Sequence, residues 1–405
     1  MNFIFCCNEY PPSKNGGVGT VTKIVAEELT QRGHRVIVIG SYDYYYPYLN
    51  KDKRPIKTII NNVEIHNLTY NRYKRYFGLR FSRFIQLFLR KIYVEHFIIK
   101  GAIRKQEGYI KDLADKNKTD IIEFVDYNIF NKLLKFKIKY ASYKQKTTFR
   151  IHGSASFIHY FKNGSINNTL LENDINYLSN ADFILSTSDF SSQFLKKHLN
   201  VKSKIDKIYN PISFNKKLVK PLNLESNRLL YFGKLTKTKG IFTLIKAFNE
   251  ISLKHSEFEL IIIGTGEKIQ VENEITPHVK SQVKFLGFVS DEELVDEIDK
   301  SYLCILPSYF ENFSMAALEV LSRKRTLIYT KRASGPELID DGENGILVNP
   351  EDHEELKNKI EKLIIDKDYN FQLAEKGYKH CMKHFSTDKI VDSLEGYYRS
   401  ILANS

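Results

Sequence analysis

One arrangement of residues occurs twice in this chain and limits what it can fold into. Each copy has an apolar run, a glycine-containing loop, a stripe of apolar residues at helical spacing and a second apolar run. The first copy consists, in this order, of residues 3–7, Gly16-Gly17, 18–29 and 36–39. The second consists of residues 229–232, Gly233, 241–251 and 260–263. Continuous apolar strands that alternate with helices predict parallel sheets covered on both faces.

The repeated unit predicts an α/β protein with two Rossmann-like domains that face each other across a cleft. We place the first domain at residues 1–209 and the second at 210–387, because Asn210-Pro211 interrupts a strand-like run. Residues 388–405 begin with helical apolar spacing, and we expect this helix to pack back on the first domain.

Composition restricts the class of protein. The 405 residues are 42% hydrophobic and 27% charged, which is typical of a globular chain. The four cysteines show no C-x-x-C spacing, so we expect neither a disulfide framework nor a zinc site. Because no signal peptide or long apolar segment is present, we expect a cytoplasmic protein without a membrane span.

Two loops have the composition of anion-binding sites. Gly16-Gly17 opens a helix after a strand, where backbone N–H groups can approach an anion without interference from a Cβ atom. Residues 233–240 place Lys234 and Lys239 between a strand and a helix N-terminus, where both charges favour a diphosphate. A solvated turn is the alternative interpretation of either loop taken alone.

The most specific segment is 311–319, in which two carboxylates lie eight residues apart among apolar neighbours. On one continuous helix, Glu311 and Glu319 would lie about 80° apart around the axis and roughly 12 Å apart along it. They could then face one ligand from its two ends. Acids in apolar surroundings need partners, which favours a binding site over a solvated surface.

Together these segments resemble glycosyltransferase family 4, whose members are retaining enzymes of the GT-B fold. The resemblance covers nearly the whole chain, and the order and spacing of the segments fit the family. The matching segments are residues 9–12 with Gly16-Gly17, 150–153, 209–212, 233–240, 311–319 and 341–348.

The resemblance implies roles for single residues. Glu311 would hold the hydroxyls of the donor sugar, and Glu319 those of the ribose. Asn312, Phe313 and Ser314 would lie at the sugar and phosphate, with the backbone N–H groups of the last two nearest them. Lys239 corresponds to the diphosphate-binding lysine, and Lys234 stands where the family usually has arginine, so bidentate phosphate binding is lost.

The resemblance also implies that the first domain binds the acceptor and the second binds the nucleotide sugar, and it assigns residues of the first domain. Gly16 and Gly17 belong to the loop that approaches the donor phosphate. His152 would lie near the transferred sugar, and we place Arg150 with it on the acceptor side. From the residues alone, a histidine beside a glycine is more often structural than catalytic.

The implied reaction is sugar transfer from a nucleotide-sugar donor to a glycan or lipid-linked acceptor, in the synthesis of a surface polysaccharide or glycoconjugate. Lys234 and Lys239 would stabilise the departing diphosphate, so we expect Glu311, His152 and both lysines to be catalytic. A UDP-sugar is favoured over a GDP-sugar, and we expect no further cofactor. We expect no metal either, because Asp366-Lys367-Asp368 has the D-x-D pattern but lies between two helical stretches, far from the other motifs.

Alternative functions are another nucleotide-sugar enzyme of the same fold, either an epimerase or a phosphorylase, and a basic nucleic-acid-binding protein. The formal net charge is +13, but no nucleic-acid motif is present. Much of the positive charge belongs to an arm at residues 72–93, in which arginines and lysines alternate with aromatic residues. This arm either packs its apolar face on the first domain or binds an anionic membrane surface or acceptor, which would make the protein peripheral at the inner face of the membrane.

Overall fold

The structure is a computed structural model that describes residues 1–11, 16–40, 57–68, 94–127, 134–201, 204–213 and 219–403. The chain divides into two compact units, which are described separately below. The first unit comprises Met1–Pro211 together with Ile390–Ser405, and the second comprises Ile212–Lys389. The predicted boundary, between residues 209 and 210, lies close to this division. The predicted arm at residues 72–93 lies outside the described residues.

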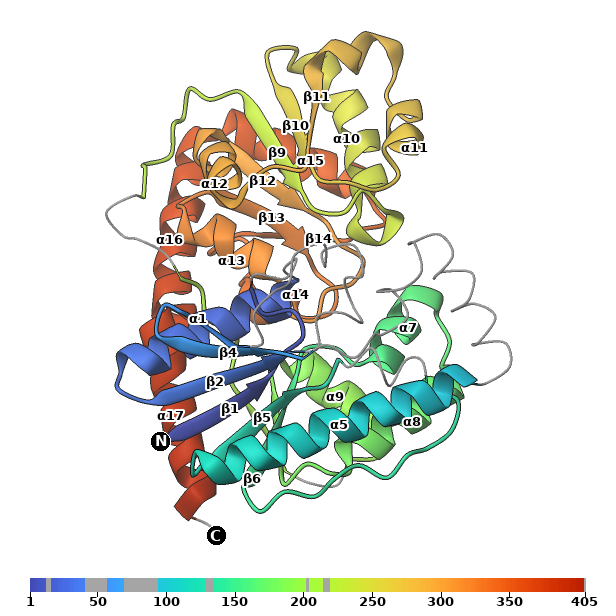
Figure 1. Cartoon of the computed structure of the whole chain (residues 1–405). Helices are drawn as coiled ribbons and strands as arrows, with labels where there is room; N and C mark the ends of the chain where they lie inside the picture. The colour runs from blue at the N-terminus through green and yellow to red at the C-terminus, as the bar shows by residue number, and fades with distance from the viewer. Residues whose placement is uncertain are drawn as a thin grey trace. The chain divides into compact units, whose positions relative to one another are not determined.

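The first unit is built on one eight-stranded sheet (Figure 1). Its strands are β1 (Asn2–Cys6), β2 (Arg35–Gly40), β3 (Lys57–Ile60), β4 (Val63–Asn67), β5 (Ile121–Val125), β6 (Lys146–Ile151), β7 (Phe183–Ser186) and β8 (Ile205–Lys207). They lie in the order β3-β4-β2-β1-β5-β6-β7-β8, and all neighbours are parallel except β3 and β4. The chain order reverses between β1 and β5, and ligands of open α/β sheets bind at such a reversal.

Within the described residues, the helices of the first unit are α1 (Gly17–Gln31), α5 (Val94–Lys116), α7 (Ala155–Asn163), α8 (Asn168–Leu178), α9 (Asp189–His198) and, from Ile390 onward, α17 (Thr387–Ala403). Side-chain caps fix several helix starts: Ser154, for example, accepts a hydrogen bond from the Phe157 N–H at the start of α7. Helix α17 (red in Figure 1) joins this unit through buried apolar residues, and the Tyr398 ring contacts that of Phe3.

The second unit has a six-stranded, fully parallel sheet. Its strands are β9 (Arg228–Phe232), β10 (Glu259–Ile263), β11 (Val283–Gly287), β12 (Leu303–Leu306), β13 (Thr326–Thr330) and β14 (Ile346–Val348). They lie in the order β11-β10-β9-β12-β13-β14, so the chain order reverses between β9 and β12. The prediction of two α/β domains with parallel sheets is therefore confirmed.

The α-helices of the second unit are α10 (Ile241–Lys254), α11 (Lys268–Asn273), α12 (Asp291–Lys300), α13 (Met315–Ser322), α14 (Gly335–Leu338), α15 (His353–Ile365) and α16 (Lys367–Phe385), and its 3-10 helices are η2 (Lys237–Lys239) and η3 (Pro277–Gln282). Asp366 caps α16 by accepting the Tyr369 N–H at 2.9 Å. The D-x-D sequence at 366–368 thus lies between α15 and α16 and forms the start of α16. Among the helices of the described residues, none combines the length and apolar composition needed to cross a bilayer.

Candidate functional site

The two motif-bearing loops of the second unit meet where the chain order of its sheet reverses. One loop follows β9 and the other follows β12, and these strands are neighbours. The Tyr309 N–H donates to the Thr238 carbonyl at 2.9 Å, and the Lys239 ammonium pairs with the Glu311 carboxylate. Residues 72 positions apart in the sequence therefore form one cluster at the carboxyl edge of the sheet.

Gly240 allows this close approach. Its φ is +74°, and a Cβ atom there would lie 1.9 Å from the carbonyl oxygen of Pro307. No other residue fits, because a side chain would both overlap that backbone and be strained in the left-handed region. The glycine thus brings the lysine loop against the loop that carries Glu311.

Glu311 is held through both its carboxylate and its backbone. Besides Lys239, the Ser308 hydroxyl donates to Glu311 Oε1 at 3.2 Å. The Ser334 hydroxyl donates to the Glu311 backbone carbonyl at 3.2 Å. The side chain keeps 19% of its surface exposed, so it is fixed in place and still accessible to a ligand.

Glu311 does not belong to the helix that carries Glu319, which corrects the geometry expected from the sequence. Helix α13 begins at Met315, and Ser314 is its N-cap, accepting the Ala317 N–H at 3.2 Å. A capping residue has extended backbone, so the loop before it does not follow helical spacing. The predicted 80° and 12 Å relation between the two acids therefore does not apply. Asn312, Phe313 and Ser314 are buried between the two acids.

Glu319 is the unpaired acid of the site. Its side chain is half-buried on α13, and no group of the described residues forms a hydrogen bond or ion pair with its carboxylate. Burial raises the pKa of Glu319 to about 7, and the Asp291 carboxylate adds to the increase. A carboxylate removed from water without a partner favours a ligand that donates hydrogen bonds to it.

Lys234 is exposed at the start of the loop after β9, which also carries Lys239. Within the part of the chain that the structure describes, no carboxylate lies within ion-pair distance of its ammonium. Its backbone carbonyl accepts the Tyr231 hydroxyl at 2.8 Å, which fixes the loop rather than the charge. The carboxyl edge of the second sheet therefore offers one paired lysine, Lys239, and one lysine without an ion-pair partner among the described residues, Lys234.

On the first unit, the predicted glycines lie at the start of α1. Gly16 is the N-cap residue, and a Cβ atom on it would lie 2.3 Å from a carboxylate oxygen of Glu9. Gly17 is the first residue of α1 and is exposed. A Cβ atom on Gly19 would lie 2.0 Å from the Glu9 backbone carbonyl, so this turn depends on glycine.

His152 lies in a turn that a buried carboxylate holds. The oxygens of Asp126 accept the backbone N–H of His152 at 2.8 Å and that of Gly153 at 3.0 Å. Burial raises the pKa of Asp126 to about 7, against the lowering effect of these two N–H groups. Burial, with a contribution from Arg150, lowers the pKa of His152 to about 3. The imidazole is therefore neutral at pH 7, and its Nε2 is buried without a hydrogen-bond partner among the described residues.

Arg150 does not have the environment of an acceptor-binding residue. Its side chain is 2% exposed, and its guanidinium donates to Glu123 at 2.9 and 3.2 Å and to the Tyr398 hydroxyl at 3.1 Å. These bonds join β5, β6 and α17. We therefore correct the assignment of Arg150 to acceptor binding: its charge is used inside the first unit, where an unpaired guanidinium would be costly.

Sequence reasoning missed Asp126, Ser308 and Ser334. Asp126 could have been found, because it directly follows residues 121–125, which are apolar except for Glu123, and thus lies at the carboxyl end of a strand. Ser308 lies three residues before Glu311 in the same loop, but nothing in its sequence context marks it as a partner of that acid. Ser334 carries no signal either, since its contact with Glu311 depends on how β12 and β13 are placed side by side.

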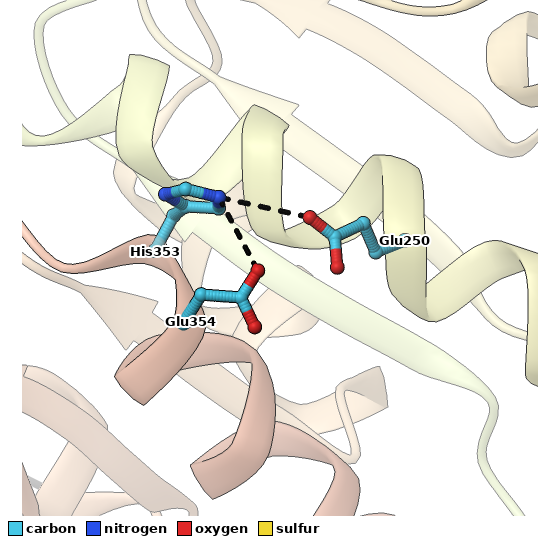
Figure 2. Close-up of side chains that lie close together, drawn as sticks. All are labelled: Glu250, His353 and Glu354. Atoms are coloured by element: carbon cyan, nitrogen blue, oxygen red, sulfur yellow. Dashed lines mark ion pairs between the residues drawn. The ribbon is translucent and has the colours of Figure 1, made fainter.

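One group of possible metal ligands among the described residues lies on α10 and α15. Figure 2 shows Glu250, His353 and Glu354, with His353 Nε2 3.6 Å from Glu250 Oε1 and 3.5 Å from Glu354 Oε1. The Lys357 ammonium donates to Glu250 Oε2 at 2.7 Å and also pairs with Glu354. Because Lys357 already pairs with both carboxylates, we interpret the group as a surface ion-pair network.

Two family models match the chain and together span residues 15–380. The model described as Glycosyltransferase Family 4 matches residues 15–216, and the model described as Glycosyl transferases group 1 matches residues 214–380.

Several characterised or named proteins are similar in sequence over part of their length. An uncharacterised glycosyltransferase of Methanocaldococcus jannaschii is 29% identical over 224 residues, which cover 55% of this chain and 61% of that protein. The alpha-D-kanosaminyltransferase of Streptomyces kanamyceticus is 28% identical over 43% of this chain and 45% of its own. The capsular polysaccharide biosynthesis glycosyltransferase CapM of Staphylococcus aureus is 27% identical over 43% and 46%. Each match thus spans less than two thirds of the relative's length.

Solved structures share the fold over the whole chain. Sucrose-phosphate synthase of Thermosynechococcus elongatus superposes with a TM-score of 0.77 at 18% identity, with both chains fully covered. HepE of Anabaena, in complex with UDP and glucose, superposes with a TM-score of 0.67 at 16% identity, covering 99% of this chain and 100% of that one.

Proposed function

Because the chain belongs to the glycosyltransferases of family 4 and has the GT-B fold, we propose that it transfers a sugar, with retention of configuration, from a nucleoside-diphosphate sugar to a glycan or lipid-linked acceptor. The similarity to CapM supports a place in the synthesis of a surface polysaccharide or glycoconjugate. The sequence relatives named above are glycosyltransferases and one neighbour is a sucrose-phosphate synthase, so an epimerase, a phosphorylase or a nucleic-acid-binding protein is not favoured.

The observation that carries this proposal is the meeting of Lys239 and Glu311 at the reversal of the second sheet. A diphosphate needs cations, and a sugar needs fixed hydrogen-bond acceptors for its hydroxyls. We propose that Lys239 and Lys234 bind the diphosphate and that Glu311 accepts the donor sugar's hydroxyls, with Asn312, Phe313 and Ser314 beside it. The unpaired Glu319 would accept the two ribose hydroxyls, a role that fits a carboxylate without a partner.

The proposed chemistry needs no covalent nucleophile. The acceptor hydroxyl attacks the anomeric carbon from the face that the nucleoside diphosphate leaves, through an oxocarbenium-like state. The carbon–oxygen bond to the diphosphate breaks as the new glycosidic bond forms, and the hydroxyl proton passes to the departing diphosphate. Positive charge fixed at the leaving group stabilises this transition state more than the ground state, and Lys234 and Lys239 supply it. A metal ion is not required for this role.

On the first unit, His152 is the residue we assign to the transferred sugar. Its imidazole is neutral at pH 7, so it offers one nitrogen that donates and one that accepts a hydrogen bond. The buried, unpartnered Nε2 is suited to a sugar hydroxyl. We assign the start of α1 to the donor phosphate, where Gly17 is exposed and presents backbone without a side chain.

The donor is tested by thermal stabilisation. A ligand at 100 times its dissociation constant stabilises the folded state by about 2.7 kcal/mol, which raises the melting temperature measurably. The UDP bound in the HepE structure supports a uridine donor. We therefore expect UDP to raise the melting temperature more than GDP or ADP at equal concentration, and an equal response to all three would contradict the choice of base.

The stereochemistry and the metal requirement are tested in one experiment. The anomeric proton of the product is followed by NMR with and without EDTA. We expect retained configuration and an unchanged rate after chelation. An inverted product would remove the retaining assignment, and loss of activity that Mg²⁺ or Mn²⁺ restores would show that the lysines do not replace a metal.

A further inference from the structure

A small aromatic cavity lies inside the first unit, apart from the loops described above. It has a volume of about 50 Å³ and lies between α5 and the strands β1, β5 and β6. Six aromatic rings surround it: Phe124, Tyr127, Tyr140, Tyr143, Phe149 and Tyr177. Four ring pairs among them pack with centroids 4.8–5.6 Å apart, which makes the wall rigid.

The polar group of interest in this cavity is Glu107, which lies on α5. One carboxylate oxygen accepts the Ala141 N–H at 2.7 Å, and no cation of the described residues forms an ion pair with it. Burial raises the pKa of Glu107, and the more distant Lys111 and Arg104 oppose the increase. Burial also raises the pKa values of Tyr140 and Tyr143, with a contribution from Glu107 to each. The Glu107 carboxylate is therefore close enough to the tyrosine hydroxyls of the cavity wall to affect their ionisation.

A carboxylate surrounded by aromatic rings is selective for positive charge. Ring faces attract an ammonium ion through their quadrupole, and the Lys111 ammonium already lies 5.8 Å from the centroid of the Tyr143 ring. A half-buried carboxylate that forms no ion pair with a described residue gains from a further cation. One water needs about 10–15 Å³ on this measure, so the cavity holds a group of about four non-hydrogen atoms. A pyranose ring is too large for it.

We propose that this cavity binds a small organic ammonium group, such as a primary amine on two or three carbons. The further statement that the group belongs to the acceptor rests on the proposed function, because the first unit is the one to which we assign the acceptor. Binding of the ammonium group itself does not depend on that assignment.

The test uses two probes that match in shape and differ in charge, isopropylammonium and 2-propanol. Binding to the full chain is measured at pH 8 by NMR titration. We expect saturable binding of isopropylammonium and about tenfold weaker binding of 2-propanol. Equal binding of the two, or no saturable binding of the ammonium, would overturn the proposal.

Variants locate the probe. Glu107→Gln keeps an acceptor for the Ala141 N–H and removes the charge, so we expect about a tenfold loss of isopropylammonium affinity. Glu172→Gln, an exposed carboxylate on α8, is the matched control and should bind as wild type does. If Glu107→Gln fails to fold by its melting curve, Tyr143→Leu replaces it and removes one ring of the wall. An unchanged affinity in a folded Glu107→Gln or Tyr143→Leu protein would show that the ammonium binds elsewhere.

The link to the acceptor is tested separately. Isopropylammonium should compete with the acceptor and leave hydrolysis of the donor alone unchanged. Ammonium binding in a protein that neither binds nucleotide nor transfers sugar would contradict the proposed function and leave the cavity site intact. If isopropylammonium does not inhibit transfer, the cavity is not part of the acceptor site.

Discussion

Single side chains at the carboxyl edge of the second unit differ in whether the protein already gives them a partner. Glu311 is bound by Lys239 and Ser308, whereas Glu319 has no partner among the described residues. Paired charges in the ligand-free protein keep the site neutral, and a ligand that brings both phosphate and hydroxyls replaces the pair with two new interactions. The unpaired acid instead destabilises the protein until a ligand satisfies it.

Glu311→Gln tests the paired acid. The amide keeps the volume and removes the charge that orders Lys239 and receives the sugar's hydroxyls. We expect transfer to fall about 100-fold or more, which is the usual effect of removing a group that stabilises the transition state. The melting temperature should change little, because the side chain is partly exposed. Glu343→Gln, which breaks an exposed ion pair with Lys376, is the matched control; full activity of Glu311→Gln would remove Glu311 from the site.

Glu319→Gln tests the unpaired acid through the pH dependence of stability. The folded-state pKa of Glu319 is about 7, and a glutamate in an unfolded chain titrates near 4.3. Between these values the folded protein binds more protons than the unfolded chain, so the free energy of unfolding falls as pH rises from about 4 to about 7 and then levels. Glutamine does not titrate, so the variant should lose less stability over this window.

The measurement for this prediction is the melting temperature at several pH values between 4.5 and 8. Wild type is compared with Glu319→Gln and with Glu292→Gln, an exposed control on α12. We expect the control to follow the wild-type curve. If Glu319→Gln shows the same pH dependence as wild type, the carboxylate of Glu319 does not have the raised pKa.

At the scale of elements, the sequence predicted the strands better than the positions of side chains. Apolar runs at residues 3–7, 229–232 and 260–263 correspond closely to β1, β9 and β10, because strands buried on both faces need unbroken apolar sequence. Helix starts were harder to predict: the motif at 311–319 spans a loop and α13, and the cap at Ser314 separates them.

Contacts between loops could not be predicted from the sequence. The turn with His152 depends on Asp126, which lies 26 residues earlier, and the Lys239 pair joins residues 72 positions apart. Such contacts follow from strand order, which a pattern of apolar residues does not specify. The burial of Arg150 in a bond network with Tyr398 was missed for the same reason, since it needs α17 against β5 and β6.

Gly240→Ala tests the loop contact that strand order creates. The added Cβ atom would lie 1.9 Å from the Pro307 carbonyl oxygen at a φ of +74°, so the lysine loop must move. We expect lower stability and a raised KM for the donor, measured by melting curves and steady-state kinetics. Gly396→Ala in α17 is the matched control, because no atom lies within 4 Å of its Cβ position. There the change should stabilise the helix by about 0.5–1 kcal/mol, and an equal loss in both variants would contradict the steric argument.

At the scale of the whole molecule, the net charge of +13 is unevenly distributed along the chain. Residues 51–109 carry 14 lysines and arginines against 4 acids, which gives 14 − 4 = +10. The arm at residues 72–93 lies within this stretch and outside the described residues, and α5 begins directly after it. Two interpretations of the arm therefore remain: a helix packed on the first domain, or a segment that contacts a membrane.

The last prediction decides between them. Four exposed cations near an anionic surface, at about 1 kcal/mol each, are enough for measurable binding. If the arm binds membranes, wild type should co-sediment with anionic vesicles and not with neutral ones. Binding should weaken as salt rises from 0.05 to about 0.5 M, because screening shortens the range of the attraction.

Two quadruple variants give the matched comparison. Replacement of Arg80, Arg83, Arg90 and Lys91 by glutamine removes four charges from the arm, and replacement of Lys268, Lys284, Lys300 and Lys376 removes four exposed charges from the second unit. Both proteins have the same net charge, so a general charge effect would weaken both equally. We expect only the arm variant to lose vesicle binding. Equal loss in both variants would show that binding depends on net charge rather than on the arm. If wild type does not bind anionic vesicles at low salt, the membrane interpretation is wrong and the packed-helix interpretation remains.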